Sequence, residues 1–376
     1  MSMKVSVSPL SEAAGIVFAA LIACAALLFT AGQKIDLENL AKGEQNISRI
    51  ESHNGIPYTA FTMKDIKTLI ENRAETGTGY NNVLWLGNSQ LHYINQYNEG
   101  DHLAPHWLRQ EWKAPGSLDP LGFSLPNANF QEYLVLSRYT RIKLPVSMLI
   151  IELVFDDLRE DGLRNEFADI LTLDIADEIH DNSASAESIV NRFLAANKTS
   201  NGESSKSVLS GTIQGPVESW LNRKLGNVWP LWADRAQIEG KILYGLYRVR
   251  NAVFGIKSIS VRKIIHSRYV LNMAALADIL ADYQQLGTPV LLYIAPIRQD
   301  KPIPYDASEY AQWKSEVDTL ANKYDARLIN LETLVPGEYW GSYTGDEIDF
   351  MHFRGPGHRM VADALLPHVK SLLTER

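Results

Sequence analysis

Short, continuous apolar runs recur along this chain and alternate with segments that are predicted to be helices. The runs occupy residues 83–86, 145–155 and 289–295, and residues 326–331 are predicted as a fourth strand. The predicted helices occupy residues 129–139, 269–286, 308–324 and 357–373. Uninterrupted apolar runs of this length are typical of strands buried on both faces of a parallel sheet. Strands that alternate with helices therefore predict an α/β fold with a mainly parallel sheet.

Composition and charge exclude several classes of protein. The chain has 376 residues, 45% hydrophobic and 21% charged, which is typical of a folded globular protein. Its formal net charge is −8 and no block of basic residues occurs, so nucleic acid is not an expected partner. The single cysteine, Cys24, excludes an internal disulfide and a cysteine metal site. His102 and His106 have helical ligand spacing, but Pro105 between them argues against such a helix, so no metal or other cofactor is predicted.

The N-terminal segment predicts contact with a lipid bilayer. Residues 13–32 carry no charge, and these 20 residues match the ~20 that a helix needs to cross the hydrocarbon core. Lys4 and the amino terminus precede the run. The positive-inside tendency therefore places residues 1–12 in the cytoplasm and the rest of the chain beyond the membrane.

Three interpretations of this uncharged run remain. The run is long for the apolar part of a signal peptide, which favours an uncleaved membrane anchor. A cleaved signal peptide would end near Thr30-Ala31-Gly32. Leu21-Ile22-Ala23-Cys24 resembles a lipoprotein processing box, although apolar residues continue after it. A buried helix of a soluble protein is disfavoured because the run has no polar face.

The remainder of the chain divides into a linker and a main domain. Residues 33–80 are polar and mixed, and we expect them to connect the anchor to a domain that spans 81–376. Within that domain, residues 197–207 are small and polar, which is typical of flexible segments. Tryptophans and tyrosines among charged residues follow this stretch. We predict a mostly helical insertion over about 165–260 that covers one side of the core.

Two short motifs, far apart in the sequence, predict a nucleophile and its base. Leu86-Gly87-Asn88-Ser89-Gln90 ends the first apolar run, and a strand, a glycine turn and a helix start expose a side chain at the carboxyl edge of a sheet. Asp349 lies three residues before His352. An imidazole activates a serine by taking its proton, and a carboxylate holds the imidazole in the required tautomer. Ser89, His352 and Asp349 are therefore predicted to form a catalytic triad for acyl-ester chemistry.

Each of these residues also has a structural interpretation. Ser89 is otherwise a surface serine after a strand, His352 a loop histidine, and Asp349 the cap of a turn or helix. His358, six residues after His352, is expected to be structural.

The order and spacing of these motifs resemble the SGNH (GDSL-type) hydrolase superfamily. The resemblance covers roughly residues 80–160 and 260–375 and is strongest to the membrane-anchored branch, which includes the D-alanyl transfer protein of teichoic acid synthesis and the alginate O-acetylation proteins. It implies a three-layer α/β/α, flavodoxin-like sandwich on the outer side of a bacterial cytoplasmic membrane, in the periplasm or at the cell exterior. It further implies acyl-ester chemistry on a cell-envelope polysaccharide, with a membrane-bound O-acyltransferase as a partner.

The chain departs from the family pattern at the oxyanion hole. Asn127 occupies the position of the family's glycine, and the segment 152–157 contains no asparagine where the family has one. The backbone amide of Ser89 and the side chain of Asn127 or Asn129 would then supply the donors.

Three more side chains are predicted near the site. Asn88 and Gln90 flank the nucleophile, and Arg298 follows a strand at its carboxyl end. We expect all three to line the substrate pocket, although turn chemistry also explains Asn88 and a nearby carboxylate also explains Arg298.

Two functions follow from these motifs. The first is a serine esterase or O-acyltransferase that transfers an acyl group to the polysaccharide or removes it. The second is a catalytically weak subunit that presents a glycan or docks the acyltransferase. The spacing alone does not separate transfer from hydrolysis.

Overall fold

The structure is a computed structural model that describes residues 46–76, 81–112, 118–160, 261–342 and 348–374, with short stretches between 162 and 191. The predicted membrane segment 13–32 and most of the predicted insertion 165–260 lie outside these residues. All described residues belong to one compact unit, formed by 42–198 and 257–376. Within that part of the chain, no helix combines the length and the apolar character that a membrane crossing requires.

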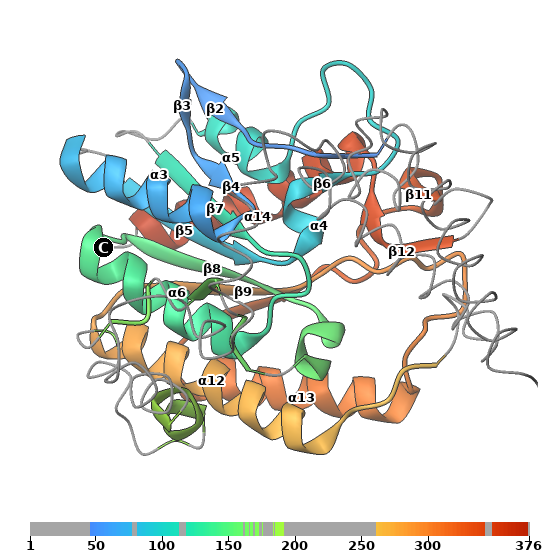
Figure 1. Ribbon diagram of the computed structural model, residues 1–376. Helices are drawn as coiled ribbons and strands as arrows, with labels where there is room; N and C mark the ends of the chain where they lie inside the picture. Colours follow the sequence, from blue (N-terminus) through green and yellow to red (C-terminus); the bar gives the residue numbers. More distant parts are fainter. Residues whose placement is uncertain are drawn as a thin grey trace, which may run out of the picture. The chain divides into compact units, whose positions relative to one another are not determined.

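A six-stranded parallel sheet lies at the centre of the described residues (Figure 1). Its order is β10-β9-β8-β5-β7-β4. The strands are β4 (Thr59–Ala60), β5 (Asn81–Gly87), β7 (Leu118–Ser124), β8 (Met148–Leu153), β9 (Val290–Ile294) and β10 (Arg327–Asn330). If the edge strand β4 is left out and the other five strands are numbered by their order in the chain, their order across the sheet is 2-1-3-4-5. This is the strand order of flavodoxin-like folds. The predicted α/β fold with a parallel sheet is confirmed.

Helices cover both faces of this sheet. Apolar side chains from α3 (Met63–Thr76), α6 (Phe130–Lys143), α12 (His266–Gln285) and α13 (Ala307–Lys323) form one core with the strands. Side chains from α5 (Ala104–Glu111) and α14 (Gly355–Thr374) form a second core. Each strand contributes side chains to both cores, because successive side chains of a strand point to opposite faces of the sheet. In β5, Leu84 and Leu86 belong to the first core, and Val83 and Trp85 belong to the second.

Shorter elements lie around the edges of the sheet. They are β1 (Ile47–Ser48), β2 (Ser52–His53), β3 (Ile56–Pro57), α4 (Ser89–His92), β6 (Tyr93–Ile94), η1 (Phe155–Arg159), η4 (Gly337–Tyr339), β11 (Trp340–Ser342) and β12 (Ile348–Phe353). The hairpin of β11 and β12 is antiparallel and carries the C-terminal motif. Strand β1 pairs with β6, directly after the nucleophile motif.

Strand β7 has no counterpart among the predicted strands, because Asp119, Pro120 and Gly122 interrupt its apolar character. Asp119 is 1% exposed and pairs with Arg73 of α3, so its charge is compensated inside the fold. Gly122 lies against Thr59 and Pro105, where an added Cβ would come within 3.0 Å of the threonine Cγ2. The strand depends on partners that are distant in the sequence.

Part of the predicted linker 33–80 belongs to the domain itself. Strand β4 pairs in parallel with β7 at the sheet edge. The α3 residues Ile66, Leu69 and Ile70 are at most 3% exposed and pack in the first core. The lead-in to the domain therefore ends before residue 46, and residues 46–76 contribute to its stability through buried apolar surface.

Candidate active site

Ser89 lies where the central strand of the sheet meets a short helix. Strand β5 ends at Gly87, Asn88 caps α4 through a side-chain oxygen that accepts the N–H of Gln90, and Ser89 begins the helix. In a parallel sheet the carboxyl ends of the strands form the edge where ligands bind. Ser89 is half-buried at this edge.

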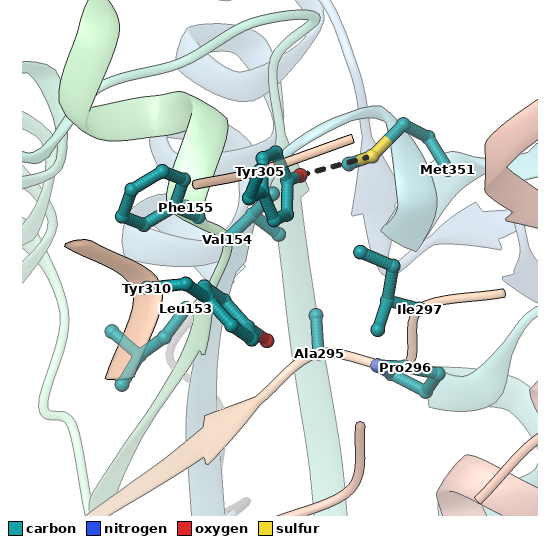
Figure 2. A pocket seen from close by; sticks show the side chains of 9 residues that line it. All are labelled: Leu153, Val154, Phe155, Ala295, Pro296, Ile297, Tyr305, Tyr310 and Met351. Atoms are coloured by element: carbon teal, nitrogen blue, oxygen red, sulfur yellow. Dashed lines mark hydrogen bonds between the residues drawn. The ribbon is translucent and has the colours of Figure 1, made fainter. Parts of the chain in front are cut away.

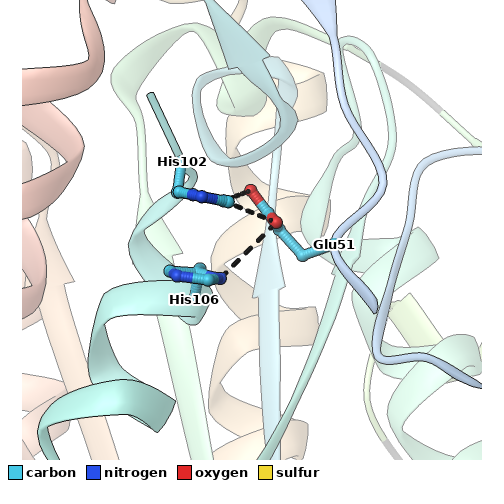
Figure 3. A group of neighbouring side chains, drawn as sticks. All are labelled: Glu51, His102 and His106. Atoms are coloured by element: carbon cyan, nitrogen blue, oxygen red, sulfur yellow. Dashed lines mark hydrogen bonds and ion pairs between the residues drawn. The ribbon is translucent and has the colours of Figure 1, made fainter. Parts of the chain in front are cut away.

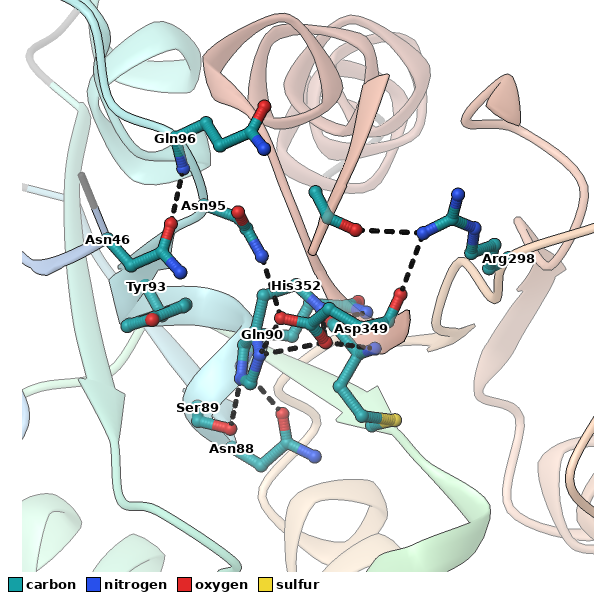
Figure 4. Close-up of polar contacts among 12 residues, drawn as sticks. Asn46, Asn88, Ser89, Gln90, Tyr93, Asn95, Gln96, Arg298, Asp349 and His352 are labelled. Atoms are coloured by element: carbon teal, nitrogen blue, oxygen red, sulfur yellow. Dashed lines mark hydrogen bonds and ion pairs between the residues drawn. The ribbon is translucent and has the colours of Figure 1, made fainter. Parts of the chain in front are cut away.

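The structure brings Ser89, His352 and Asp349 together (Figure 4). The Oγ of Ser89 lies 2.8 Å from Nε2 of His352. The other ring nitrogen, Nδ1, lies 3.0 Å from Oδ2 and 3.2 Å from Oδ1 of Asp349. The acid and the imidazole both belong to β12, while the serine comes from α4. This is the hydrogen-bonded order of nucleophile, base and orienting carboxylate that an activated serine requires.

Asp349 is fully buried, and hydrogen-bond donors surround its carboxylate. Burial alone would raise its pKa, but His352, together with the backbone N–H groups of Met351 and His352, holds the pKa of Asp349 below its usual value. The side-chain amide of Asn95 also donates to Oδ2, at 2.8 Å. Asp349 is therefore an anion at neutral pH, which is the form that orients a histidine.

The sequence does not predict that Asn95 contacts Asp349, nor that Gly341 lies beside the Asn95 side chain. Asn95 is fully buried and reaches Asp349 beside Gly341, where a Cβ would lie 1.8 Å from the Asn95 side-chain oxygen. The only signal in the sequence is an amide residue shortly after the nucleophile motif.

Aromatic packing fixes the imidazole from the side. The ring of Tyr93 meets the ring of His352 edge-on, with centroids 4.3 Å apart. His358 in turn contacts the carbonyl oxygen of Tyr93 at 3.0 Å, and burial lowers the pKa of His358 to about 4. His358 is thus neutral at pH 7 and supports Tyr93, in agreement with its expected structural role.

Two buried carboxyl groups hold the turn that carries Ser89. The backbone N–H of Asn88 donates to Oε2 of Glu152 at 3.0 Å, and its side-chain amide donates to Oδ1 of Asp157 at 3.1 Å. Glu152 is the only charged residue of the apolar run 145–155, which is the signal that could have identified it. Both acids belong to the segment where the sequence lacks the expected asparagine, and the structure gives them contacts with the nucleophile turn.

Glu152 is held on its other side as well. The hydroxyl of Tyr293 donates to Oε1 at 3.1 Å and lies 3.3 Å from Nε1 of Trp85. Burial raises the pKa of Glu152 to about 8, although the hydrogen bonds from Asn88 and Tyr293 oppose the shift. A Cβ at Gly87 would lie 2.6 Å from Oε2 of Glu152, so the strand end accepts only glycine without movement of this carboxyl group.

We expect Glu152→Ala to weaken both the fold and the reactivity of Ser89. The change leaves the buried N–H of Asn88 without an acceptor, at about 1–3 kcal/mol, and removes the acceptor of the Tyr293 hydroxyl, which keeps only its contact with Trp85. Glu152→Gln keeps the size and an acceptor, so it should retain the reactivity of Ser89. Denaturant unfolding and the rate of labelling by a fluorophosphonate measure the two effects. Equal labelling rates in both variants would contradict a role for Glu152 in positioning the turn.

The pH dependence of stability provides a second check on Glu152. Its folded pKa of about 8 exceeds the ordinary value of 4.5, so the folded state keeps a proton that the unfolded state releases between these values. The free energy of unfolding of the wild type should therefore fall, relative to Glu152→Gln, as the pH rises from about 4.5 to 8. Parallel curves for the two proteins would show that burial does not shift this group.

The other predicted pocket residues take different places. Gln90 is buried, and its Nε2 donates to the carbonyl oxygens of Pro296 at 3.0 Å and Met351 at 2.7 Å. It therefore ties the nucleophile helix to the loop after β9 and to strand β12. Arg298 forms an ion pair with Asp300, and its Nη1 donates to the carbonyl oxygens of Gly341 at 2.8 Å and Asp349 at 3.4 Å. Through these contacts, Arg298 stabilises the main chain around Asp349.

Asn127 and Asn129 have separate roles. Asn127 is exposed and has a φ of +51°, a left-handed conformation that favours glycine or asparagine. The loop that contains it is tied to the nucleophile turn, because the N–H of Leu125 donates to the carbonyl oxygen of Gly87 at 3.2 Å. Asn129 instead caps α6 in a capping box with Glu132, and its amide nitrogen donates to Gly162 at 2.7 Å. We therefore assign Asn129 to the helix cap and not to an oxyanion hole.

Glu51, His102 and His106 converge beside the start of α5 (Figure 3). Their ligand atoms lie within 4.8 Å of one another. His102 precedes α5, and the helix accommodates Pro105 in its first turn. The sequence did not predict this convergence. The imidazole rings are stacked, with centroids 3.6 Å apart and planes at 8°, and both Nδ1 atoms face the carboxylate of Glu51, at 2.9 and 3.6 Å from its Oε2.

The guanidinium group of Arg49, which is always positively charged, lies beside this cluster. Arg49 donates to Oε1 of Glu51 at 2.8 Å, and its Nη2 lies 3.2 Å from Nδ1 of His102. A metal ion would be repelled by the guanidinium. We therefore assign the cluster a structural role, in which it links the segment around Arg49 to α5.

No protein-family model matches the sequence, and no curated protein matches it. Several solved esterase structures are among those to which the fold is similar. An aryl esterase of M. smegmatis is 13% identical, with a TM-score of 0.33 over 78% of this chain and 100% of that chain. Axe2, an acetylxylan esterase from Geobacillus stearothermophilus, is 9% identical, with a TM-score of 0.38 over 80% and 99%. A carbohydrate acetylesterase family member from Sinorhizobium meliloti is 12% identical, with a TM-score of 0.35 over 78% and 99%. TM-scores this low carry no conclusion about chemistry, which is inferred from the geometry of this chain's own residues.

Proposed function

We propose that this protein is a serine-dependent enzyme of the SGNH type that acts on acyl esters. The observation that carries the proposal is the contact of 2.8 Å between Ser89 Oγ and His352 Nε2, with Asp349 on the opposite side of the ring. Ser89 attacks the acyl carbonyl while His352 takes the hydroxyl proton. The imidazolium then returns this proton to the leaving alcohol oxygen as the ester bond breaks, which leaves an acyl group on Ser89.

The second half of the reaction repeats these roles with a new acceptor. His352 takes a proton from water or from a sugar hydroxyl, whose oxygen attacks the acyl-enzyme. The acyl group leaves Ser89, which recovers its proton from the imidazolium. Water gives a free acid, and a sugar hydroxyl gives a new ester, so one site supports both hydrolysis and transfer.

The oxyanion that forms in each half needs hydrogen-bond donors. Ser89 is the first residue of α4, and such a residue has no carbonyl partner one turn earlier in its helix. Its N–H is one proposed donor. The left-handed Asn127 loop, in the position of the glycine of the family that the chain resembles, is the proposed second source. One oxyanion donor typically contributes about 10²–10³-fold in rate.

We further propose that the acyl acceptor or donor is a cell-envelope polysaccharide. This part rests on the sequence: an uncharged run at 13–32 and the resemblance to the membrane-anchored branch. A membrane-bound O-acyltransferase is the proposed partner that supplies the acyl group. The domain would then work beyond the cytoplasmic membrane, in the periplasm or at the cell exterior.

Acceptor-dependent turnover separates transfer from hydrolysis. We expect p-nitrophenyl acetate to release nitrophenol faster when an envelope polysaccharide is added, because sugar hydroxyls compete with water for the acyl-enzyme. Mass spectrometry of the polysaccharide should detect the added acyl groups. The same experiment with Ser89→Ala controls for spontaneous transfer. Free acetate at an unchanged rate, with no acylated glycan, would identify an esterase.

A binding subunit is the second candidate function. It is favoured by the segment 152–157, where Glu152 and Asp157 are buried and hold Asn88 instead of offering an asparagine to the oxyanion. A folded wild-type protein that is not labelled by a fluorophosphonate, but that binds the polysaccharide, would support this alternative.

A further inference from the structure

Hydrogen-bond donors hold both oxygens of the Asp349 carboxylate. Oδ1 accepts the backbone N–H groups of Met351 and His352 at 2.9 and 3.0 Å, and both residues belong to the same strand as Asp349, β12. Oδ2 accepts the side-chain amide of Asn95 at 2.8 Å and lies 3.0 Å from Nδ1 of His352 (Figure 4). Asn95 therefore reaches the carboxylate from outside β12 and shares Oδ2 with the imidazole of the triad.

The fold fixes Asn95 relative to this strand. Its backbone N–H donates to the carbonyl oxygen of Phe353 at 3.0 Å, so Asn95 contacts β12 at its last residue as well as at Asp349. Gly341 packs against the side-chain amide, where a Cβ would lie 1.8 Å from the amide oxygen. Among the described residues this oxygen has no hydrogen-bond partner. The bond to Asp349 is thus the polar contact that determines where the amide nitrogen points.

Asn95 is not placed to touch a substrate. It is fully buried. A small apolar hollow lies at the carboxyl ends of β8 and β9, and Met351 contributes to its wall whereas Asn95 does not (Figure 2). Any effect of Asn95 on the reaction must therefore act through Asp349.

We propose that Asn95 is a positioning residue of the triad, which holds the Asp349 carboxylate in the orientation that accepts the hydrogen bond from His352. The inference rests on the proposed acyl-ester function and adds a fourth residue to it. Hydrogen bonds from an amide to a carboxylate are charge-assisted and therefore strong. Without this bond, Oδ2 keeps only the imidazole, and the carboxylate is free to turn about its Cβ–Cγ bond. A misplacement of about 1 Å in such a site costs about 10²-fold in rate.

Asn95→Leu keeps the branched shape of the side chain and removes the donor. The kcat for p-nitrophenyl acetate should fall by about 10²-fold, and KM should change by less than about twofold, because the residue does not contact the substrate. Asn82→Leu on β5 is the matched control. Asn82 is also fully buried, its amide nitrogen donates to the carbonyl oxygen of Pro145 at 2.9 Å, and its oxygen has no partner among the described residues. This variant should lose stability in denaturant but keep the wild-type kcat.

Asn95→Asp gives a readout in the pH profile. A carboxyl group here donates to Asp349 only while it is protonated, and burial beside the Asp349 charge raises its pKa above the ordinary value of about 3.9. The ratio of variant to wild-type kcat should therefore fall by about tenfold or more between pH 5 and pH 8. The other charged groups nearby change little in this range. Arg298, whose Nη1 lies 3.4 Å from the Asp349 carbonyl oxygen, stays charged, and His358 has a pKa of about 4. The titration of His352 is common to both proteins.

A double-mutant cycle shows whether Asn95 acts through the carboxylate. In the Asp349→Ala background, Asn95→Leu should change the residual kcat by less than about twofold, because no carboxylate remains to be oriented. Equal losses in both backgrounds, a wild-type kcat in folded Asn95→Leu, or a flat ratio for Asn95→Asp would each overturn the positioning role while the ester chemistry stands. If Asn95→Leu does not fold, the pH profile of Asn95→Asp decides. A wild type that neither turns over esters nor reacts with a fluorophosphonate would overturn the proposed function itself.

Discussion

Ser89→Ala is expected to abolish covalent labelling by a fluorophosphonate and to reduce ester turnover by about 10⁶-fold, the loss typical of removing a triad nucleophile. The hydroxyl contacts His352 at 2.8 Å and alanine retains no group that can form the acyl-enzyme. Labelling followed by intact-protein mass spectrometry measures the covalent step directly, and p-nitrophenyl acetate measures turnover. The fold should be unaffected, because Ser89 is half-buried at a strand end and alanine is a good helix former.

A second serine at the start of a helix provides the matched control. Ser308 lies in the first turn of α13 and its hydroxyl donates to Asp306 at 2.6 Å. Ser308→Ala should be labelled at the wild-type rate. Undiminished labelling of Ser89→Ala would assign the nucleophile to another residue and refute the triad.

Asp349→Asn should lower kcat by about 10⁴-fold, the loss that follows when the orienting carboxylate of a triad becomes an amide. The carboxylate accepts hydrogen bonds from Asn95 and from the backbone of Met351 and His352, besides the ring of His352. An amide nitrogen in this position would face donors and favour the wrong tautomer of the imidazole. Steady-state kinetics at pH 7 measure the loss. Asp363→Asn, at a 50% exposed position on α14, is the control for a charge change.

The same variant has a predictable pH dependence of stability. Because the folded pKa of Asp349 is below its ordinary value of 3.8, its contribution to stability is present above that value and is lost as the pH falls through the lowered one. The stability advantage of the wild type over Asp349→Asn should therefore shrink as the pH falls from 3.8 through the lowered pKa. Denaturant unfolding across this range measures it, and an advantage that stays constant there would contradict the lowered pKa of Asp349.

The sequence predicted those parts of the fold whose signal is local. Strands β5, β8 and β9 were predicted from apolar runs, which reflect the burial of both of their faces under helices. The sequence did not predict strand β7, because the buried Asp119 is tolerated only through its pairing with Arg73, which lies 46 residues earlier. The pattern of one strand does not contain that partner, and tertiary contacts override the local preference.

The residues of the candidate site also divide into those that the sequence predicted and those that it did not. Ser89, His352 and Asp349 were predicted from residue types and spacing, and the structure brings them within hydrogen-bonding distance. The role of an amide or a carboxyl group depends instead on what folding places beside it. Asn129 caps a helix because Glu132 lies three residues later, and Glu152 holds Asn88 across 64 residues. The first pairing is a local capping pattern that the sequence contains, whereas the second depends on the fold.

The two halves of the reactive pair lie 263 residues apart in the chain. His352 and Asp349 are on β12, so a polypeptide synthesised only as far as α13 contains Ser89 but not its base. The proposed reactivity toward esters therefore depends on the synthesis and folding of β12, long after Ser89 has been added to the chain.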